Sequence, residues 1–306
     1  RGDLQLSIYG NDRILQPRNG GSPARAGSHQ AAPRSWGSTG CVSFAVKASD
    51  HFSVVADAYA LRRPAYPDEL FAFLAGAVAG HDLAWDCAAG SGQASIPLTR
   101  YFRRVIATDS SSAMLAKAPV HPSVEYRRGS AYDSALEAGS ADLVSVAQAL
   151  HWFERERFYA EAHRVLKPGG ILAVWTYGAC GCLMSGPDGN QLIEDQAVTA
   201  VVTRFYHEVV GPYWPLERCH VEAGYSTISF PYPELDHPDF QMQQHWTLDE
   251  LLGYIGTWSA TQLYRDATGS DPIPELGREL QRLWGDNRSS RLVRWPLTLR
   301  VGRRPE

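Results

Sequence analysis

The sequence predicts an α/β protein built on a parallel sheet. Three observations predict it: short apolar runs alternate with helical patterns between residues 83 and 177, a turn of small residues follows the first run, and an acid ends the second. Parallel strands need crossover connections, which are right-handed in nearly all proteins. We therefore expect helices on both faces of the sheet and a ligand at the carboxyl edge of its strands.

Periodicity and helix-boundary signals define the elements of this alternating part. Pro67 and two following acids mark one helix start, and a Lys-Pro-Gly-Gly sequence marks the end of a later helix. We predict strands at 83–87, 104–108, 124–127, 142–147 and 171–177, and helices at 51–61, 67–80, 93–101, 112–118 and 154–166.

The alternation stops after residue 178. A capping-box pattern at Thr247 and Glu250 predicts a further helix start. We predict a loop at 181–191, extended segments at 228–233 and 240–245, helices at 192–210, 248–255 and 274–284, and a final strand at 292–301.

The chain has two compositional parts. Gly, Ser, Pro, Ala and Arg dominate residues 17–40, which contain no acid, and such a segment buries too little apolar area to fold alone. We predict a disordered or leader-like extension at 1–48, with an organelle transit peptide as the alternative. Residues 49–306 are predicted to fold, with a core at 82–178 and substrate-side insertions and the last sheet elements at 179–290.

The bulk composition excludes several classes of protein. A formal net charge of −4 gives no electrostatic reason to expect nucleic acid, and no apolar run approaches the roughly 18 residues of a membrane helix. The five scattered cysteines favour a reducing compartment over a disulfide framework. Cys180 and Cys182 lack a second ligand pair, so we expect no metal site. These observations predict a cytoplasmic protein, monomeric or homodimeric.

The turn after the first strand is the first candidate ligand site. Asp86, Ala88, Gly90 and Gly92 follow an acid-x-small-x-Gly-x-Gly spacing, and small residues let a backbone approach a ligand closely. Asp86 is expected to brace the turn or to meet a cationic ligand group. A dinucleotide fingerprint would need a third glycine, where this chain has Ser95. A nicotinamide-dependent enzyme is therefore disfavoured but remains open.

Asp109 is the second candidate, because it directly follows an apolar strand. An ionised carboxylate accepts hydrogen bonds from both hydroxyls of a ribose. The alternative is a surface acid that caps the helix at 112–118. The position of Asp109 at the strand end favours the ribose.

Two more candidate groups follow the third and fourth strands. Ser130, Ala131 and Tyr132 leave room for a flat purine. Gln148, His151 and Trp152 form an unusual wall for simple packing, and His151 is the side chain best suited to exchange a proton near neutral pH. Ordinary packing of His151 and Trp152 is the alternative.

These motifs resemble those of class I S-adenosylmethionine (SAM)-dependent methyltransferases. Within this superfamily the chain resembles the trans-aconitate methyltransferase-like and embryo-abundant branch with a type 11 domain. The branch-like residues are Tyr59, the sequence from Arg63 to Pro67, and the sequence AQALHWF at 147–153. WDCAAGSGQAS at 85–95 resembles the first methyltransferase motif, with Ala88 in place of its usual first glycine.

The resemblance implies a Rossmann-like fold, SAM as the cofactor and a role for each matching residue. The sheet would have seven strands, mostly parallel, with an antiparallel C-terminal strand and helices on both faces. Asp109 would hold the ribose, Gln148 would border the reactive end, and His151 and Trp152 would lie near the substrate. The methionine part would contact Asp86, Ala88, Gly90 and Gly92, the adenine would contact Ser130, Ala131 and Tyr132, and Tyr59, Arg63 and Tyr66 would belong to the substrate side or a lid.

The predicted reaction is methyl transfer to a small molecule, at a carboxylate or hydroxyl oxygen. A carboxylate acceptor needs cationic or N–H partners, for which Arg62, Arg63 and His151 are candidates. A phenol or amine needs a proton acceptor, for which we select His151. The alternatives are a nicotinamide-dependent oxidoreductase and a non-catalytic binding protein with a cofactor fold.

Overall fold

The computed structural model describes residues 63–185 and 192–306. The described residues fall within one compact unit of the chain. The predicted extension at 1–48, the predicted helix at 51–61 and Tyr59 lie outside the described residues.

A nine-stranded sheet forms the centre of the described part, two strands more than the resemblance implies. Its strand order is β3-β2-β1-β4-β5-β9-β6-β7, and β8 also pairs with β9. The first five strands pair in parallel, as predicted, and β1 is buried along its whole length. The strands are β1 (Leu83–Cys87), β2 (Arg104–Asp109), β3 (Val124–Arg128), β4 (Ala141–Ala147), β5 (Leu166–Tyr177), β6 (Gly181–Ser185), β7 (Leu192–Glu194), β8 (Phe240–Trp246) and β9 (Arg291–Arg303).

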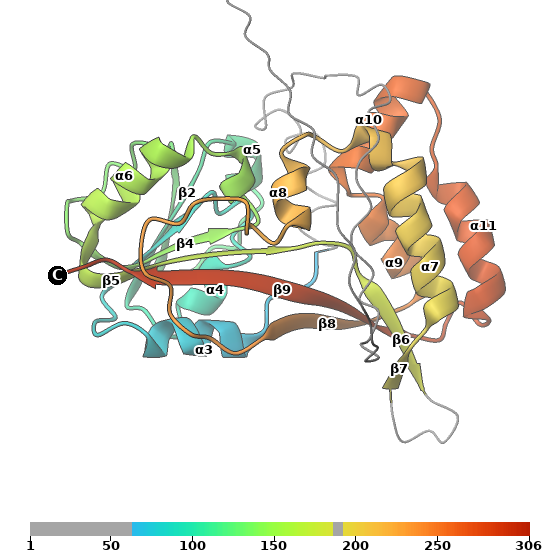
Figure 1. The fold of residues 1–306 in the computed structure, drawn as a ribbon, viewed down its shortest axis with the longest axis horizontal. Coiled ribbons are helices and arrows are strands. Elements are labelled where there is room, and N and C mark those ends of the chain that lie inside the picture. Colours follow the sequence, from blue (N-terminus) through green and yellow to red (C-terminus); the bar gives the residue numbers. More distant parts are fainter. Residues whose placement is uncertain (1–62, 186–191) are drawn as a thin grey trace, which may run out of the picture. The chain divides into compact units, whose positions relative to one another are not determined.

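The last strand, β9, connects the parallel strands with β6 and β8. It pairs antiparallel with β5 from Ile171↔Arg303 to Tyr177↔Leu297, and its other pairs are with β6 and β8. The predicted antiparallel C-terminal strand is therefore confirmed. Figure 1 shows β9 as one long strand that runs from the parallel sheet toward α7, α9 and α11.

The helices lie in two groups. Figure 1 shows α3 and α4 on one side of the sheet and α5 and α6 on the other, whereas α7 and α9–α11 gather at one end. The α-helices are α3 (Asp68–Gly76), α4 (Ser95–Leu98), α5 (Ser112–Leu115), α6 (Arg155–Val165), α7 (Gln196–Arg204), α8 (Arg218–Glu222), α9 (Leu248–Ile255), α10 (Ser259–Thr268) and α11 (Ile273–Trp284). Three further turns are 3-10 or π-helical: η1 (Leu150–Trp152), η2 (Phe205–Val209) and η3 (Gly211–Tyr213).

Several predicted elements differ from the observed ones. The helix predicted at 93–101 is reduced to α4, because Gly90 and Gly92 adopt positive φ and the turn continues to residue 94. The predicted loop at 181–191 contains β6. The helix predicted at 192–210 begins instead with β7. The Lys-Pro-Gly-Gly sequence at 167–170, predicted to end a helix, follows the end of α6 and is part of β5, and residues 228–233 form no strand.

Apolar side chains pack on both faces of the sheet. Trp175 and Trp295 belong to one buried cluster and Trp85 to the other, and all three side chains are fully buried. Replacing a buried tryptophan by alanine costs about 3–5 kcal/mol, so both clusters contribute to stability. Two packed faces leave the strand ends as the place for a ligand.

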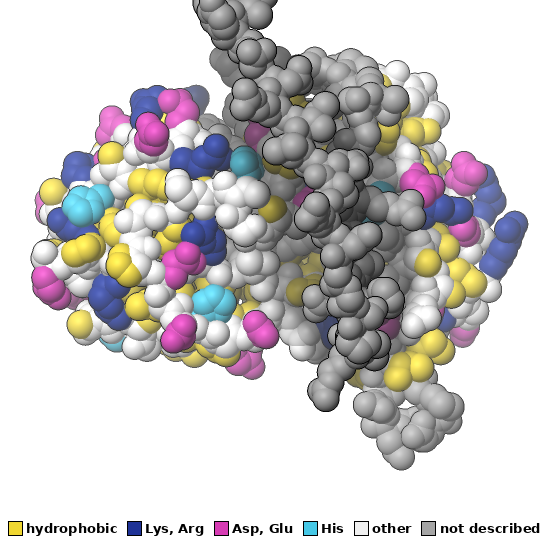
Figure 2. Space-filling model, viewed as in Figure 1, with side chains coloured by type: hydrophobic (Ala, Val, Ile, Leu, Met, Phe, Trp, Pro, Cys, Tyr) yellow, Lys and Arg dark blue, Asp and Glu magenta, His cyan; other side chains and the backbone are white. Residues whose placement is uncertain are grey.

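The described surface carries mixed charge. Figure 2 shows Lys, Arg, Asp and Glu side chains interspersed over the described part of this face. Exposed ion pairs such as Arg104–Glu125 and Arg157–Glu154 contribute to this pattern. Among the described helices, none combines the length and the apolar character that a membrane span requires.

Candidate functional site

The turn after β1 brings the backbone against an open cavity. Ala88 and Gly90 both have φ of +56°, and both line this cavity. The backbone N–H of Ala89 donates to Thr108 O (3.0 Å), which ties the turn to the end of β2. Gly92 does not line the cavity, because its Cα faces the Tyr126 ring beneath the turn. Only small side chains therefore separate the turn backbone from a ligand.

Asp86 lies under this turn and does not line the cavity. Its side chain is fully buried and accepts hydrogen bonds from Ser95 Oγ (2.6 Å) and Ser145 Oγ (3.0 Å). Burial raises the pKa of Asp86 to about 6, and the two serine hydrogen bonds oppose this shift. The bracing role that the sequence allowed for Asp86 agrees with this position. A direct contact between Asp86 and a ligand does not.

Asp109 stands at the end of β2, where two cavities meet. Gly90 N donates to one carboxylate oxygen and Ser111 N to the other, each at 2.8 Å. Each oxygen keeps a second lone pair, so the carboxylate can also accept two hydroxyl hydrogen bonds. Burial raises the pKa of Asp109, and the backbone N–H groups counteract the shift.

The residues predicted to flank an adenine lie on the far side of Asp109. Ser130, Ala131 and Tyr132 line the second cavity. Tyr132 Oη accepts a hydrogen bond from Glu154 N (2.9 Å), and the Arg157 guanidinium lies 4.6 Å from the centre of the Tyr132 ring. Both contacts fix the orientation of this ring.

The cavity on the turn side of Asp109 spans about 830 Å³, with the solvent space at its mouth included. Tyr66 lines it and packs edge-to-face on Trp175, with ring centres 5.5 Å apart. A nucleoside with a small charged tail fits this arrangement, because the turn, the carboxylate and the second cavity are continuous through Ala88 and Asp109.

Gln148 lies at the end of β4 and closes the cavity on the turn side of Asp109. This cavity is called the cofactor-side cavity below. The backbone of Gln148 is left-handed (φ +56°), an uncommon conformation for a non-glycine residue. Its side-chain amide donates to Tyr177 O (2.9 Å) and accepts from Tyr177 N (3.1 Å) and from Thr176 Oγ1. The amide thus extends the β4–β5 pairing by one step at the strand ends.

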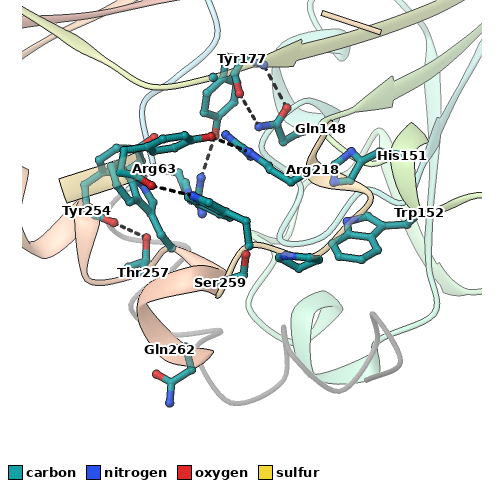
Figure 3. Close-up of a pocket in the computed structure, with 15 residues that line it drawn as sticks. Arg63, Gln148, His151, Trp152, Tyr177, Arg218, Tyr254, Thr257, Ser259 and Gln262 are labelled. Atoms are coloured by element: carbon teal, nitrogen blue, oxygen red, sulfur yellow. Dashed lines mark hydrogen bonds between the residues drawn. The ribbon is translucent and has the colours of Figure 1, made fainter. Parts of the chain in front are cut away.

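A second pocket begins on the other side of Gln148. It spans about 800 Å³, with the solvent space at its mouth included, and it shares Gln148 and Trp152 with the cofactor-side cavity. Figure 3 shows Tyr177, Gln148, His151 and Trp152 on the sheet side and Tyr254 with Thr257 on the helical side. The described lining residues are Arg63, Gln148, His151, Trp152, Tyr177, Gly178, Tyr206, Trp214, Pro215, Arg218, Tyr254, Thr257, Trp258, Ser259 and Gln262.

Two arginines give this pocket its charge, and its described lining contains no acid. Arg218 Nε donates to Tyr206 Oη (2.9 Å) and Glu222 Oε1 (3.1 Å), and its guanidinium lies 4.6 Å from the Trp214 ring centre. Within the described part of the chain, the two terminal nitrogens of Arg218 have no hydrogen-bond partner. They can therefore receive an anion.

Arg63 approaches the pocket from the segment before α3. Its Nη1 donates to Tyr177 Oη (3.1 Å), and its guanidinium lies 5.3 Å from the Tyr254 ring centre. Arg63 was predicted from the sequence as a cationic partner of a carboxylate. Arg62, the other arginine proposed there, lies outside the described residues.

His151 lines the same pocket but is a weak base there. The residue is 6% exposed, and its Nδ1 lies 2.9 Å from Tyr225 Oη. Burial, with smaller effects from Arg218 and His220, lowers the pKa of His151 to about 3. The ring is therefore neutral near pH 7. This environment disfavours the predicted role of His151 as a proton acceptor.

Comparisons with known proteins agree with this geometry. Residues 85–174, from β1 to β5, match the methyltransferase domain family. A Dictyostelium discoideum protein named as a methyltransferase is 32% identical over 240 residues, which cover 78% of this chain and 88% of that protein. The chain belongs to the SAM-dependent methyltransferases.

A solved structure from Anaeromyxobacter dehalogenans, assigned to the type II methyltransferases, resembles this methyltransferase in fold. It is 41% identical with a TM-score of 0.71, and the match covers 80% of this chain and 99% of that chain. An uncharacterized methyltransferase of Mycobacterium tuberculosis is 36% identical over 126 residues, which cover 40% of this chain and 51% of that protein. Membership of the family decides for methyl transfer over the nicotinamide and non-catalytic alternatives.

The sequence interpretation missed part of the methyltransferase's second pocket. Arg218, Tyr254 and Trp258 belong to no motif, and they come from segments far from β4 in the sequence. The aromatic residues between 178 and 258 are the one available signal in the sequence. They do not distinguish Tyr206 and Trp214, which line the pocket, from Tyr213, His245 and Trp246, which do not.

Proposed function

We propose that this methyltransferase transfers the methyl group to a carboxylate oxygen of a small organic acid. The observation that carries the proposal is the pocket beyond Gln148, which presents the guanidinium groups of Arg63 and Arg218 and no acidic side chain among its described lining residues. A guanidinium pairs well with a carboxylate in a partly buried site. A carboxylate-accepting branch, such as the trans-aconitate-like one, agrees with this chemistry.

The aromatic walls indicate the rest of the substrate. Tyr206, Trp214 and Trp258 line the pocket around Arg218, and aromatic surfaces favour an apolar or flat body. An organic acid with a planar or apolar portion next to its carboxylate therefore suits the pocket.

Different segments of the chain form the two sites. The predicted core at 82–178 supplies most of the cofactor side, and the segment at 179–290 supplies the helical wall of the substrate pocket. We assign Ala88 and Gly90 to the methionine part, Asp109 to the ribose and residues 130–132 to the adenine. Asp86 acts beneath them as a brace.

Methyl transfer to a carboxylate requires no general base from the protein. When bound, SAM supplies a methyl group that its positive sulfur already activates, so a carboxylate can accept the group without losing a proton. Arg218 holds the acid, Gln148 and Trp152 border both cavities, and the surrounding walls exclude water from the reacting groups. A hydroxyl acceptor is the second candidate, but it needs a base, and the low pKa of His151 counts against it.

The test is methyl transfer from labelled SAM to acids in a metabolite extract, followed by mild alkali. A methyl ester hydrolyses and releases labelled methanol, whereas a methyl ether or a methylamine keeps the label. We expect an alkali-labile product. A product that is stable to alkali would contradict the carboxylate assignment.

Two substitutions separate the two sites. Asp109→Ala is expected to lower SAM affinity at least tenfold in titration calorimetry, because a ribose diol loses its acceptor. Arg218→Gln is expected to raise the KM for the acid at least tenfold and to leave SAM affinity within twofold. Arg204→Gln is the matched control, since this exposed arginine pairs with Glu279 outside both cavities. Unchanged SAM binding by Asp109→Ala would remove the ribose assignment.

A further inference from the structure

Tyr225 lies outside the pocket, and hydrogen bonds from two other segments hold its backbone in place. It follows α8, has a left-handed backbone (φ +60°) and is fully buried. Its N–H donates to His220 O (2.8 Å), and its carbonyl accepts from Arg300 Nη1 on β9 (2.9 Å). Two elements far apart in sequence therefore hold Tyr225 in position, and its hydroxyl reaches His151.

The hydrogen bond from Tyr225 involves only one edge of the His151 ring. Nδ1 faces Tyr225 Oη at 2.9 Å, whereas Nε2 has no hydrogen-bond partner within the described part of the chain. Since Tyr225 lies behind the pocket wall and His151 lines the pocket, the Nε2 edge is the polar edge left for a ligand. Figure 3 shows the His151 ring close to Arg218 and Trp152.

The direction of this hydrogen bond follows from the chemistry of the two groups. A phenol O–H is a stronger donor than the N–H of a neutral imidazole, and the unprotonated imidazole nitrogen is a stronger acceptor than a phenol oxygen. At a separation of 2.9 Å between Nδ1 and Tyr225 Oη, the favoured arrangement therefore has Tyr225 donating its proton to Nδ1. The proton of the neutral ring is then on Nε2.

We propose that Tyr225 is a positioning residue that holds His151 as the neutral tautomer with its proton on Nε2, so that the pocket offers an N–H donor in place of a base. Arg218 and the Nε2–H of His151 then both present hydrogen-bond donors to an acidic substrate. The charged and titratable groups that face His151 agree with a neutral ring. They are Arg218 and His220 on α8, with Arg155 of α6 next to His220.

The direct test is long-range 1H–15N correlation spectroscopy on the full chain with 15N-labelled histidine. Loss of signals in His151→Gln assigns the ring. We expect the neutral pattern with the proton on Nε2, unchanged between pH 8 and pH 5. A proton on Nδ1, or a titration midpoint above pH 5, would overturn the proposal. No substrate is needed, so this result is independent of the proposed carboxylate chemistry.

The role of Tyr225 has a matched control in the same part of the fold. Tyr232 Oη lies 3.2 Å from His163 Nδ1, a second tyrosine–histidine pair that does not line either cavity. Tyr225→Phe is expected to give signals of both His151 tautomers, whereas Tyr232→Phe leaves the His151 signals unchanged. A single Nε2 tautomer in Tyr225→Phe would remove the positioning role.

A kinetic experiment on His151 variants, which rests on the proposed function, tests the proposal even if Tyr225→Phe fails to fold. Glutamine places its amide near the position of Nε2, and asparagine places it near Nδ1. We expect His151→Gln to keep kcat within tenfold of the original and His151→Asn to lose at least a hundredfold. A general base would make both variants lose about 10²–10⁴-fold in rate. Equal hundredfold losses would therefore contradict the donor role.

Discussion

At the scale of single residues, one alanine and one glutamine with left-handed backbones border the cofactor-side cavity. Ala88 and Gln148 both have φ of +56°. An L-residue in this region costs about 1–2 kcal/mol, and such strain persists only where the surroundings determine it. Both residues end a strand at the cofactor-side cavity, so the strain coincides with the site.

Replacing Ala88 with glycine is expected to stabilise the protein. Glycine removes the left-handed penalty of about 1–2 kcal/mol, and its own entropy cost of about 0.5–1 kcal/mol leaves a net gain of about 0–1.5 kcal/mol. Urea unfolding measures this gain. Ala89→Gly is the adjacent control and is expected to destabilise, because Ala89 is buried and has no positive φ. A less stable Ala88→Gly would contradict the argument.

The sequence indicated cavity-lining residues where a strand end determines their position. The places of Asp109, Gln148 and His151 beside the cavities could be predicted, because each follows an apolar strand by one or a few positions. Arg218 and Tyr225 could not, because α8 and the loop after it reach His151 only through tertiary packing. The ion pairing of Arg300 with Glu234 and its hydrogen bond to the Tyr225 carbonyl hold that loop, and no local pattern encodes them.

At the scale of elements, local signals predicted the helix starts better than the chain path after β5. The capping box at Thr247 is confirmed: Thr247 Oγ1 accepts from Glu250 N, and the Glu250 carboxylate accepts from Thr247 N. The β6–β7 hairpin was missed, because its exposed Met184, Leu192 and Ile193 gave no alternation of buried and exposed positions.

Thr247→Ala is expected to lower the free energy of unfolding by about 1 kcal/mol, the usual cost of losing an N-cap. Because α9 carries Tyr254 into the second pocket, the same change is expected to weaken acid binding more than SAM binding. Urea unfolding and titration calorimetry measure the two effects. Thr203→Ala, at an exposed position within α7, is the control and should not destabilise. Full stability of Thr247→Ala would show that the cap is dispensable.

At the scale of the whole molecule, two buried groups act on acid stability in opposite directions. The pKa of His151 falls to about 3, so the folded state binds fewer protons than the unfolded chain and stability is lost as pH falls below 6.5. The pKa of Asp86 rises to about 6, so the folded state binds more protons and stability is gained as pH falls toward 4.

Paired variants separate these two contributions. Between pH 6 and pH 4 the original protein is expected to lose about 1 kcal/mol per pH unit relative to His151→Gln, and to gain about as much relative to Asp86→Asn. Urea unfolding at pH 6, 5 and 4 measures both differences. Differences that do not change with pH would mean that these groups titrate alike in the folded and unfolded states.

The general architecture was predictable because alternation, turns and strand-end polar residues act locally. The resemblance implied seven strands, and the described part of the chain forms nine. The additional pairing arises because β9 extends beyond the end of β5, where it pairs with β6 and β8. Such long-range pairing depends on the length of the final strand, which its alternation alone did not define.

The shared position of Gln148 has a consequence for how this enzyme could acquire new acceptors. The side-chain amide of Gln148 links the ends of β4 and β5, and the residue borders both cavities. A substitution of Gln148 therefore disturbs the binding of the methyl donor and of the acceptor together. Drift toward new acids would then proceed through distant wall residues such as Trp258 and Gln262, which touch only the second pocket. The sheet edge would stay constant while the helical wall diversifies.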